Sequence, residues 1–373
     1  MATAEGIAIS DTRGAAKKKE DIGQVSQWTL MRRRFLENRL SVIGGIVLIL
    51  MYLMAAFSSF VAPYPFDALD SNNQYAAPTP IYMINGHPSV CGVTQTLNQK
   101  DFTWVYTVDC NKAYPVKLFT HGFSYQMLGF ITTDVHLFGV DPPAKLYIFG
   151  ADGQGRDVLS RVLEGSRISL TIGLIGVTLA VILGSILGTI SGFLGGAADN
   201  LIQRIIELIM SMPTIPLWAA LAAALPQDMA VAKRYFLITL ILSLVQWTGL
   251  ARQVRGKVMA YRTLDYTLAA RLAGASDMRI ILTHMLPNAV SHIIVVAALA
   301  VPYSILGETA LSFLGLGMLP PAVSWGVLLR DAQQVHVVEQ HAWLLLPAAA
   351  VIIAVTCYQF LGDGLRDAAD PYG

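Results

Sequence analysis

The stretch Tyr266-Thr-Leu-Ala-Ala-Arg-Leu-Ala-Gly-Ala-Ser276, followed by Asp277-Met-Arg-Ile-Ile-Leu-Thr-His284 and Met285-Leu-Pro-Asn288, is a basic island between two apolar runs. Small residues dominate its first part, which leaves a helix surface that another protein can approach closely. Gly274 is suited to end one helix, and Ser276 is suited to start another. We therefore expect two short helices joined at Gly274-Ala275, with Pro287 in the first turn of the next helix.

The composition predicts a chain that crosses a membrane several times. Of its 373 residues, 54% are hydrophobic and 14% are charged, whereas soluble domains carry about 25% charged residues. The net charge of +1 gives no indication of a nucleic-acid partner. We expect no cleavable signal peptide because the first 30 residues are polar, and no metal site because no CxxC-type spacing occurs.

Six apolar runs free of Asp, Glu, Lys and Arg are the candidate membrane spans. They are residues 40–62, 168–194, 208–226, 235–251, 285–307 and 342–362. A spanning helix needs about 20 residues, and the short fourth run reaches that length if Arg234 and Arg252 snorkel at its ends. We expect an all-α polytopic membrane protein with six transmembrane helices and both termini on the same side.

Two features of these runs indicate how the helices pack. Gly184 and Gly188 form a Gly-x-x-x-Gly pair in the second run, which suits a helix packed closely on its neighbours. Pro213 and Pro216 interrupt the third run, and Pro302 lies in the fifth. Such breaks are tolerated where a helix is buried or lines a cavity, so they mark either packing kinks or bends along a pore.

The charges of the loops predict the orientation of the chain. The loop at 252–285 has six basic residues against two acidic ones. The positive-inside rule places this loop in the cytoplasm, together with the basic N-terminal tail and interfacial helix at 1–39. Counting six spans from a cytoplasmic N-terminus gives the same side for the loop and for the tail at 364–373.

The connection at 63–166, between the first two spans, is then an extracytoplasmic insertion. It contains turn residues rich in Pro, Asn and Thr, and strand-like aromatic pieces such as 102–108. We expect a small domain that is mostly β or irregular. Cys91 and Cys110 both lie in it, and an oxidising compartment allows them to pair as a disulfide, with two free thiols as the alternative.

The island resembles the "EAA" coupling loop of the permease subunits of binding-protein-dependent ABC importers. The resemblance rests on the pattern Ala-Ala-Arg-x-x-Gly-Ala-Ser at 269–276, followed by Leu286-Pro287. In that family the loop is cytoplasmic and docks into a groove on a separate ATPase subunit. This implies a coupling role for Ala269, Ala270, Arg271, Gly274, Ala275, Ser276 and Pro287. Leu268 departs from the pattern, because Glu is usual there.

Three further stretches resemble the same family. Residues 149–161 resemble the Gly-x-Asp-x-x-Gly-Arg-Asp-x-x-Ser-Arg signature of its dipeptide, oligopeptide and nickel branch, and lack the Lys-Ser/Thr ending of a phosphate loop. Residues 311–330 resemble the loop at the outer mouth of peptide-type permeases, where Phe313 and Trp325 suit a membrane interface. The resemblance implies outer-mouth positions for Gly315, Gly317, Pro320, Pro321, Trp325 and Gly326. The ending at 361–371 favours a C-type peptide permease.

The resemblance implies a function and a set of partners. The chain would be the permease subunit of an ATP-driven importer in the bacterial inner membrane, with 167–363 as its ABC type-1 transmembrane domain. It would move peptides, nickel, opines or oligosaccharides by alternating access. Its partners would be a second permease subunit, two ATPase subunits or one duplicated one, and an extracytoplasmic solute-binding protein. The insertion would either touch that protein or be inert. ATP and Mg would bind the ATPase subunits, and this chain would hold no cofactor.

The main alternative is an ion- or proton-coupled secondary transporter. Such a protein needs ionisable groups along a path through the membrane. Glu308 and His292, which lie in or beside the fifth run, are the two candidates. A membrane enzyme or scaffold is a further alternative, but we expect no catalytic residue because the sequence has no evident nucleophile or acid–base cluster.

Overall fold

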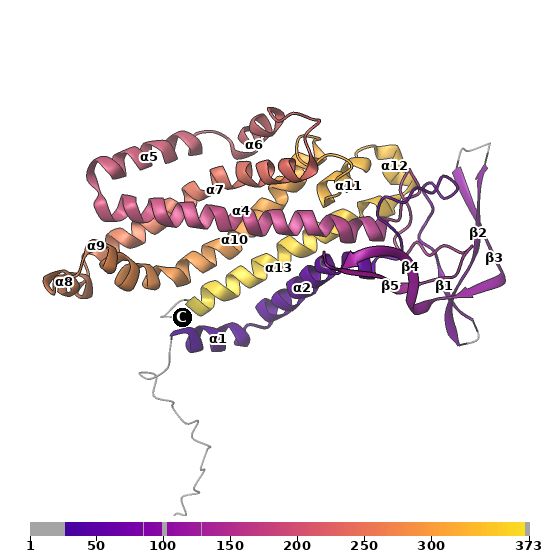
Figure 1. The fold of residues 1–373 in the computed structure, drawn as a ribbon, viewed down its shortest axis with the longest axis horizontal. Helices are drawn as coiled ribbons and strands as arrows, with labels where there is room; N and C mark the ends of the chain where they lie inside the picture. The colour runs from indigo at the N-terminus through magenta and orange to yellow at the C-terminus, as the bar shows by residue number, and fades with distance from the viewer. Residues whose placement is uncertain (1–26, 85, 99–102, 128, 370–373) are drawn as a thin grey trace, which may run out of the picture.

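The computed structural model describes residues 27–84, 86–98, 103–127 and 129–369, and its long helices run side by side as a bundle (Figure 1). Within these described residues, five segments are long and apolar enough to span a membrane: Arg39–Ala56 (α2), Val158–Leu194 (α4), Val231–Arg262 (α7), Asp277–Phe313 and Ala342–Ala369. The last two contain α10 (Leu286–Phe313) and α13 (Leu346–Ala369). The strands gather at one end of the bundle, and α8 (Asp265–Leu272) and α9 (Asp277–Arg279) lie at the other (Figure 1).

The predicted third span at 208–226 is wrong in its bounds. The structure divides this region between α5 (Gly196–Met210) and α6 (Thr214–Ala223), which are bent by 85° relative to each other. Pro213 has an extended backbone at the break, and proline both lacks the N–H that a continuous helix requires and disfavours helix in the residue before it. The chain therefore has six spans only if this bent pair counts as one.

Other helices are longer than the apolar runs that predict them. α4 has 37 residues and begins where the Asp157 side chain accepts a hydrogen bond of 2.8 Å from the backbone N–H of Ser160. The first run is instead divided, because α2 ends at Ala56 and a short helix, α3 (Ser58–Val61), follows it. Hydropathy marks only the apolar part of a helix, so capped polar extensions lie outside the prediction.

α4 and α7 pack with their backbones in direct contact. A Cβ added at Gly184 would lie 2.9 Å from the carbonyl oxygen of Trp247, and one at Gly188 would lie 2.5 Å from that of Ala251. Only glycine permits this approach, which agrees with the close packing expected from the Gly-x-x-x-Gly pair. Because α7 leads directly into α8, this contact also fixes the position at which the basic island at 266–288 begins.

The insertion folds as two small antiparallel sheets. β1 (Ile81–Ile84), β2 (His87–Asn98) and β3 (Thr103–Pro115) form one sheet in that order, and β4 (Lys117–Met127) pairs with β5 (Ile131–Gly139) in the other. This agrees with the expected β character. Cys91 on β2 and Cys110 on β3 are joined by a disulfide in the structure.

We predict that Cys91 and Cys110 are bonded in the native protein. After denaturation without reductant, alkylation and mass mapping should modify one of the three cysteines, Cys357, and reduction should expose the other two. Replacing both bonded cysteines by serine should destabilise the insertion by about 3 kcal/mol, because the bond restricts the unfolded loop. Alkylation of all three cysteines without reductant would contradict the disulfide.

Candidate functional site

The α8–α9 elbow, residues 264–285, is built around a sharp break in the backbone. Gly274 has φ +79°, which L side chains adopt only with strain, and its N–H donates to the carbonyl of Arg271 at 3.0 Å. The Ser276 hydroxyl then accepts from the N–H of Arg279 at 3.4 Å and caps α9. The structure has the predicted Gly274 turn and one short helix before it, with Pro287 in the first turn of α10. The predicted second short helix is wrong, because α9 has three residues and continues through residues 280–285 into α10 as one helix, Asp277–Phe313.

The inner face of the elbow is fixed to the bundle. Thr267 is fully buried, and its hydroxyl donates to the carbonyl of Tyr261 at 2.8 Å. Ile280 and Met285 are also fully buried and pack in one apolar cluster with Val254 and Val258 of α7. The elbow is thus attached to α7 and to the start of α10, so that a force on it reaches both helices.

The outer face of the elbow is apolar and exposed. Leu268 and Leu272 are 44% and 90% exposed, and their four-residue spacing places them on one side of α8, while Leu264, just before the helix, is 43% exposed. Met278 and Leu282 add 64% and 55% exposed side chains beyond the turn. These large side chains are not among the predicted coupling residues, which are mostly small, although the spacing of the leucines could have identified them. Leu268, where Glu is usual, belongs to this apolar stripe.

The predicted coupling residues all lie at this end of the bundle. Exposed members are Ala269, Arg271, Gly274, Ser276 and Pro287, whereas Ala270 and Ala275 are partly buried. The Arg271 guanidinium lies 5.9 Å from the centre of the Phe193 ring at the end of α4, and 4.0 Å from the Asp277 carboxylate. Arg271 therefore connects the elbow to a third helix.

The six predicted outer-mouth residues do not form one surface. Pro320 and Pro321 are exposed and Gly315 is partly buried, whereas Gly317, Trp325 and Gly326 are buried. The predicted interfacial position of Trp325 is wrong, because the side chain is 1% exposed and its indole N–H donates to the carbonyl of Val162 at 3.2 Å. The chain folds back so that α11 (Trp325–Asp331) packs against α4 and α10.

The two candidate pathway residues are not brought together. Glu308 is fully buried and accepts hydrogen bonds from the hydroxyls of Ser169 at 2.9 Å and Ser312 at 2.6 Å. These hydroxyls in turn accept from the N–H groups of Trp325 and Met318, so Glu308 anchors the folded-back loop. His292 is only half-buried and lies on the same helix, about 24 Å away at 1.5 Å per residue.

A groove between α4, α7 and α10 lies closer to the middle of the bundle. Its volume is about 390 Å³, and its walls are apolar except at a few polar side chains. Gln246 and Gln253 line it from α7, and Tyr303, which is 66% exposed, lines it from α10. Gln246 donates to the hydroxyl of Ser304 at 2.8 Å. These helices are the ones that the elbow joins.

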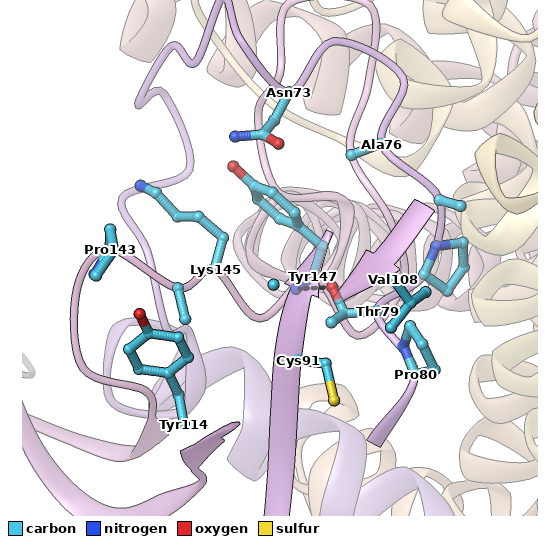
Figure 2. A pocket seen from close by; sticks show the side chains of 14 residues that line it. Asn73, Ala76, Thr79, Pro80, Cys91, Val108, Tyr114, Pro143, Lys145 and Tyr147 are labelled. Atoms are coloured by element: carbon cyan, nitrogen blue, oxygen red, sulfur yellow. Dashed lines mark hydrogen bonds between the residues drawn. The ribbon is translucent and has the colours of Figure 1, made fainter. Parts of the chain in front are cut away.

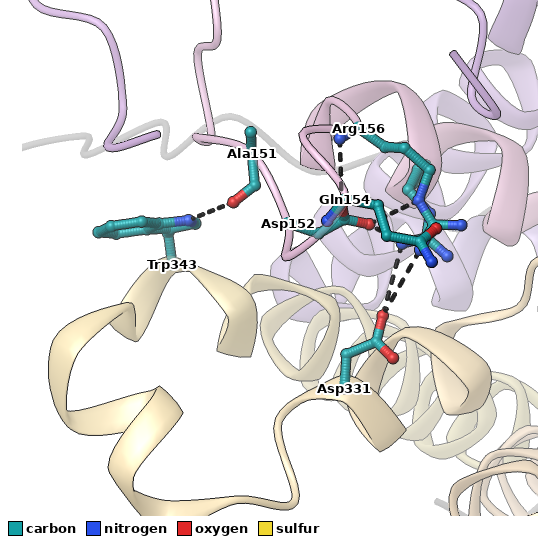
Figure 3. A network of polar contacts seen from close by, with 7 residues as sticks. Ala151, Asp152, Gln154, Arg156, Asp331 and Trp343 are labelled. Carbon is teal, nitrogen blue, oxygen red and sulfur yellow. Dashed lines mark hydrogen bonds and ion pairs between the residues drawn. The ribbon is translucent and has the colours of Figure 1, made fainter. Parts of the chain in front are cut away.

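The signature segment at 149–161 forms an ionic clamp at the opposite end (Figure 3). Asp152 is 2% exposed and accepts from the guanidinium of Arg156 at 2.8 Å and from that of Arg161. The guanidinium of Arg161 also lies 3.4 Å from the carboxylate of Asp331, at the end of α11. Burial raises the pKa of the Asp331 carboxyl, and the positive charge of Arg161 opposes that shift. Figure 3 also shows Trp343, whose indole N–H donates to the carbonyl of Ala151 at 2.9 Å, to one side of the ionic contacts.

A second cavity, of about 390 Å³, lies within the insertion, between its first sheet and the segments before β1 and after β5 (Figure 2). Asn73, Lys145 and Tyr147 border it, together with Cys91 of the disulfide. The Tyr147 hydroxyl donates to Asp70 at 3.0 Å, and Lys145 lies 3.8 Å from the same carboxylate. These polar groups are therefore engaged with one another and hold together two segments of the insertion, the one before β1 and the one after β5.

Comparison with known proteins identifies the family. Residues 159–371 match the family model described as binding-protein-dependent transport system inner membrane component. The chain belongs to this family. Residues 26–78 also match the model for the N-terminal TM domain of oligopeptide transport permease C. The chain is thus a multi-pass inner-membrane component of a binding-protein-dependent ABC transport system, and family membership does not favour a secondary transporter.

Several relatives in this family resemble the chain. The oligopeptide transport system permease protein OppC of Escherichia coli is 32% identical over 363 residues, which cover 97% of each chain. The glutathione transport system permease protein GsiD of Shigella flexneri is 42% identical over 229 residues, 61% of this chain and 73% of that protein. A putative peptide permease protein of Brucella ovis is 37% identical over 240 residues, 64% of this chain and 78% of its own length.

We predict that the clamp stabilises the fold through its buried charge. Arg161→Met should lower the free energy of unfolding by about 3 kcal/mol, near the lower end expected for breaking a buried ion pair, because Arg156 still neutralises Asp152. Lys117→Met is the matched control, since it breaks an exposed pair with Asp141 and should cost less than about 1 kcal/mol. Equal thermal unfolding of the two variants in detergent would contradict this role.

Proposed function

We propose that the chain is the permease subunit of an ATP-driven importer and works by alternating access. The observation that supports this most directly is the apolar outer face of the α8–α9 elbow, at the end of the bundle opposite the insertion (Figure 1). Large apolar side chains gathered on one exposed face mark a binding site for another protein. A separate ATPase subunit is the partner that the family resemblance implies for this surface.

The attachment of the elbow explains how ATP hydrolysis would be transmitted. The sequence contains no phosphate-binding loop ending in Lys-Ser/Thr, so the nucleotide would be bound by the ATPase subunits with Mg. Movement of those subunits would displace the elbow as a rigid lever. Its connections to α7, to α10 and through Arg271 to α4 would carry the movement to the helices that border the groove.

The groove and the insertion indicate where the other partners would bind. Gln246, Gln253 and Tyr303 offer hydrogen-bonding groups within an apolar wall, which suits a solute path shared with a second permease subunit. The basic loop at 252–285 would face the cytoplasm, which places the insertion outside, on the side from which a solute-binding protein delivers its cargo. Peptides are the proposed cargo class, because relatives are named as oligopeptide, peptide and glutathione permeases.

We predict that the leucine stripe holds the ATPase subunits. Leu272→Asp should weaken their binding roughly ten- to hundred-fold, because burying one leucine contributes about 1.5–3 kcal/mol. The measurement is co-purification with the ATPase subunits, together with ATP hydrolysis stimulated by the loaded binding protein. Leu69→Asp is the control, since Leu69 is 70% exposed in the insertion, away from the elbow. Unchanged co-purification of the Leu272 variant would overturn the docking proposal.

We also predict that the Gly274 turn is required for transport. Gly274→Trp should abolish ATP-dependent uptake into proteoliposomes while the subunit still inserts, because a bulky side chain strains the φ of +79° and covers the docking face. Gly86→Trp is the matched control, because Gly86 has the same φ and a Cβ added at either glycine would meet nothing within 4 Å. Normal ATP-dependent uptake by the Gly274 variant would refute the proposal that the elbow transmits the movement of the ATPase subunits. Uptake driven by a proton gradient alone would favour a secondary transporter.

A further inference from the structure

An apolar groove lies where the insertion meets the end of the first span. Leu53, Met54, Phe57, Phe60 and Val61 line it from α2 and α3, and Met127, the last residue of β4, completes it. Its volume is about 460 Å³, and its lining side chains are all apolar. Because it offers no hydrogen-bonding side chain, it suits a hydrocarbon ligand better than a polar solute.

The groove is continuous with the face of α2 that is exposed to the surroundings of the bundle. Leu53 and Met54, which line the groove, are 48% and 41% exposed. They extend a row of half-exposed aliphatic side chains that runs the length of α2: Leu40, Ile43, Ile46, Ile49 and Leu50. A spanning helix with such a face presents it to lipid, so the groove opens on the same lipid.

The position of Met127 sets the depth of the β4–β5 hairpin. Leu53 and Met54 lie in the last turn of α2, so a strand end that touches the same groove reaches the edge of the hydrocarbon region. Beyond Met127, Phe130 is 74% exposed and Ile131 is 48% exposed at the hairpin turn. Aromatic and aliphatic side chains at this level are typical of the membrane interface.

The hairpin is also held firmly against the bundle. His136 of β5 is 1% exposed, and its two ring nitrogens lie 2.9 Å from the carbonyl oxygen of Ser59 on α3 and 3.0 Å from that of Phe123 on β4. The ring of Phe119 lies 6.4 Å from that of Phe60. The open end of the hairpin is therefore fixed against α3, while Met127 places the turn end beside the groove.

We propose that the β4–β5 hairpin rests on the membrane surface and that the groove binds the acyl chain of a membrane lipid. The insertion would then be attached to the bilayer as well as to the helices, with Phe130 and Ile131 inserted beside the acyl chain. The proposal requires only that α2 spans the membrane. It does not depend on the cargo, on the ATPase partner or on which side of the membrane the insertion lies.

The test uses the full transporter complex in lipid nanodiscs. In a Cys357→Ala background that retains the native disulfide, Phe130→Cys is labelled with an environment-sensitive fluorophore. Met83→Cys is the matched control, because Met83 is 72% exposed and apolar but lies in the other sheet. Quenching is measured with lipid that carries a nitroxide near its headgroup and, separately, with aqueous iodide.

If the turn contacts lipid, the label on the Phe130→Cys variant should show blue-shifted emission and should lose fluorescence with the nitroxide lipid. The label on the Met83→Cys variant should be quenched by iodide alone. Quenching of the Phe130 label by iodide but not by lipid would overturn the proposal, since the turn would lie in water. Protection from both quenchers would also overturn it, because another protein subunit would then cover the groove. Ile131→Cys provides a second label site if the Phe130 variant does not assemble.

Discussion

The contact between the backbones of α4 and α7 is the constraint on which the rest of the bundle depends. Gly184 and Gly188 bring the two helices so close that a single methyl group would collide with a carbonyl oxygen of α7. In lipid, where apolar side chains gain little by leaving the solvent, such close packing is a main source of helix association. It sets the position of α7, and α7 continues directly into the elbow.

Different interactions hold the elements in place at the two ends of the bundle. At the elbow end, apolar packing of Ile280 and Met285 against α7 fixes the elbow. At the insertion end, buried polar groups do the same: Glu308 accepts from two serine hydroxyls, and Asp152 is paired with Arg156 and Arg161. Buried ionic groups demand specific partners, so this end has a well-defined arrangement, whereas the elbow keeps a free apolar face.

Exposed apolar side chains have two different explanations in this chain. On α2 they form a row along a candidate membrane span, which is the pattern of a helix that faces lipid. On α8 they lie on a short helix beyond the end of the candidate spans, and the proposed explanation there is a protein partner. The β4–β5 turn, at the opposite end of the bundle from α8, also exposes apolar side chains, and the depth proposed for it beside α2 assigns them to lipid.

The sequence by itself determined the features that depend on contiguous residues. Runs of apolar side chains marked the spans, Gly274 and Ser276 marked the elbow, and turn residues with aromatic pieces marked the β insertion, because backbone preference and hydropathy act locally. Only the tertiary structure decided what each residue faces. Trp325 is buried and Glu308 serves as an anchor because distant segments fold over them, and Leu272 is exposed because none does. Burial is set by contacts between residues far apart in the chain, and no local pattern records them.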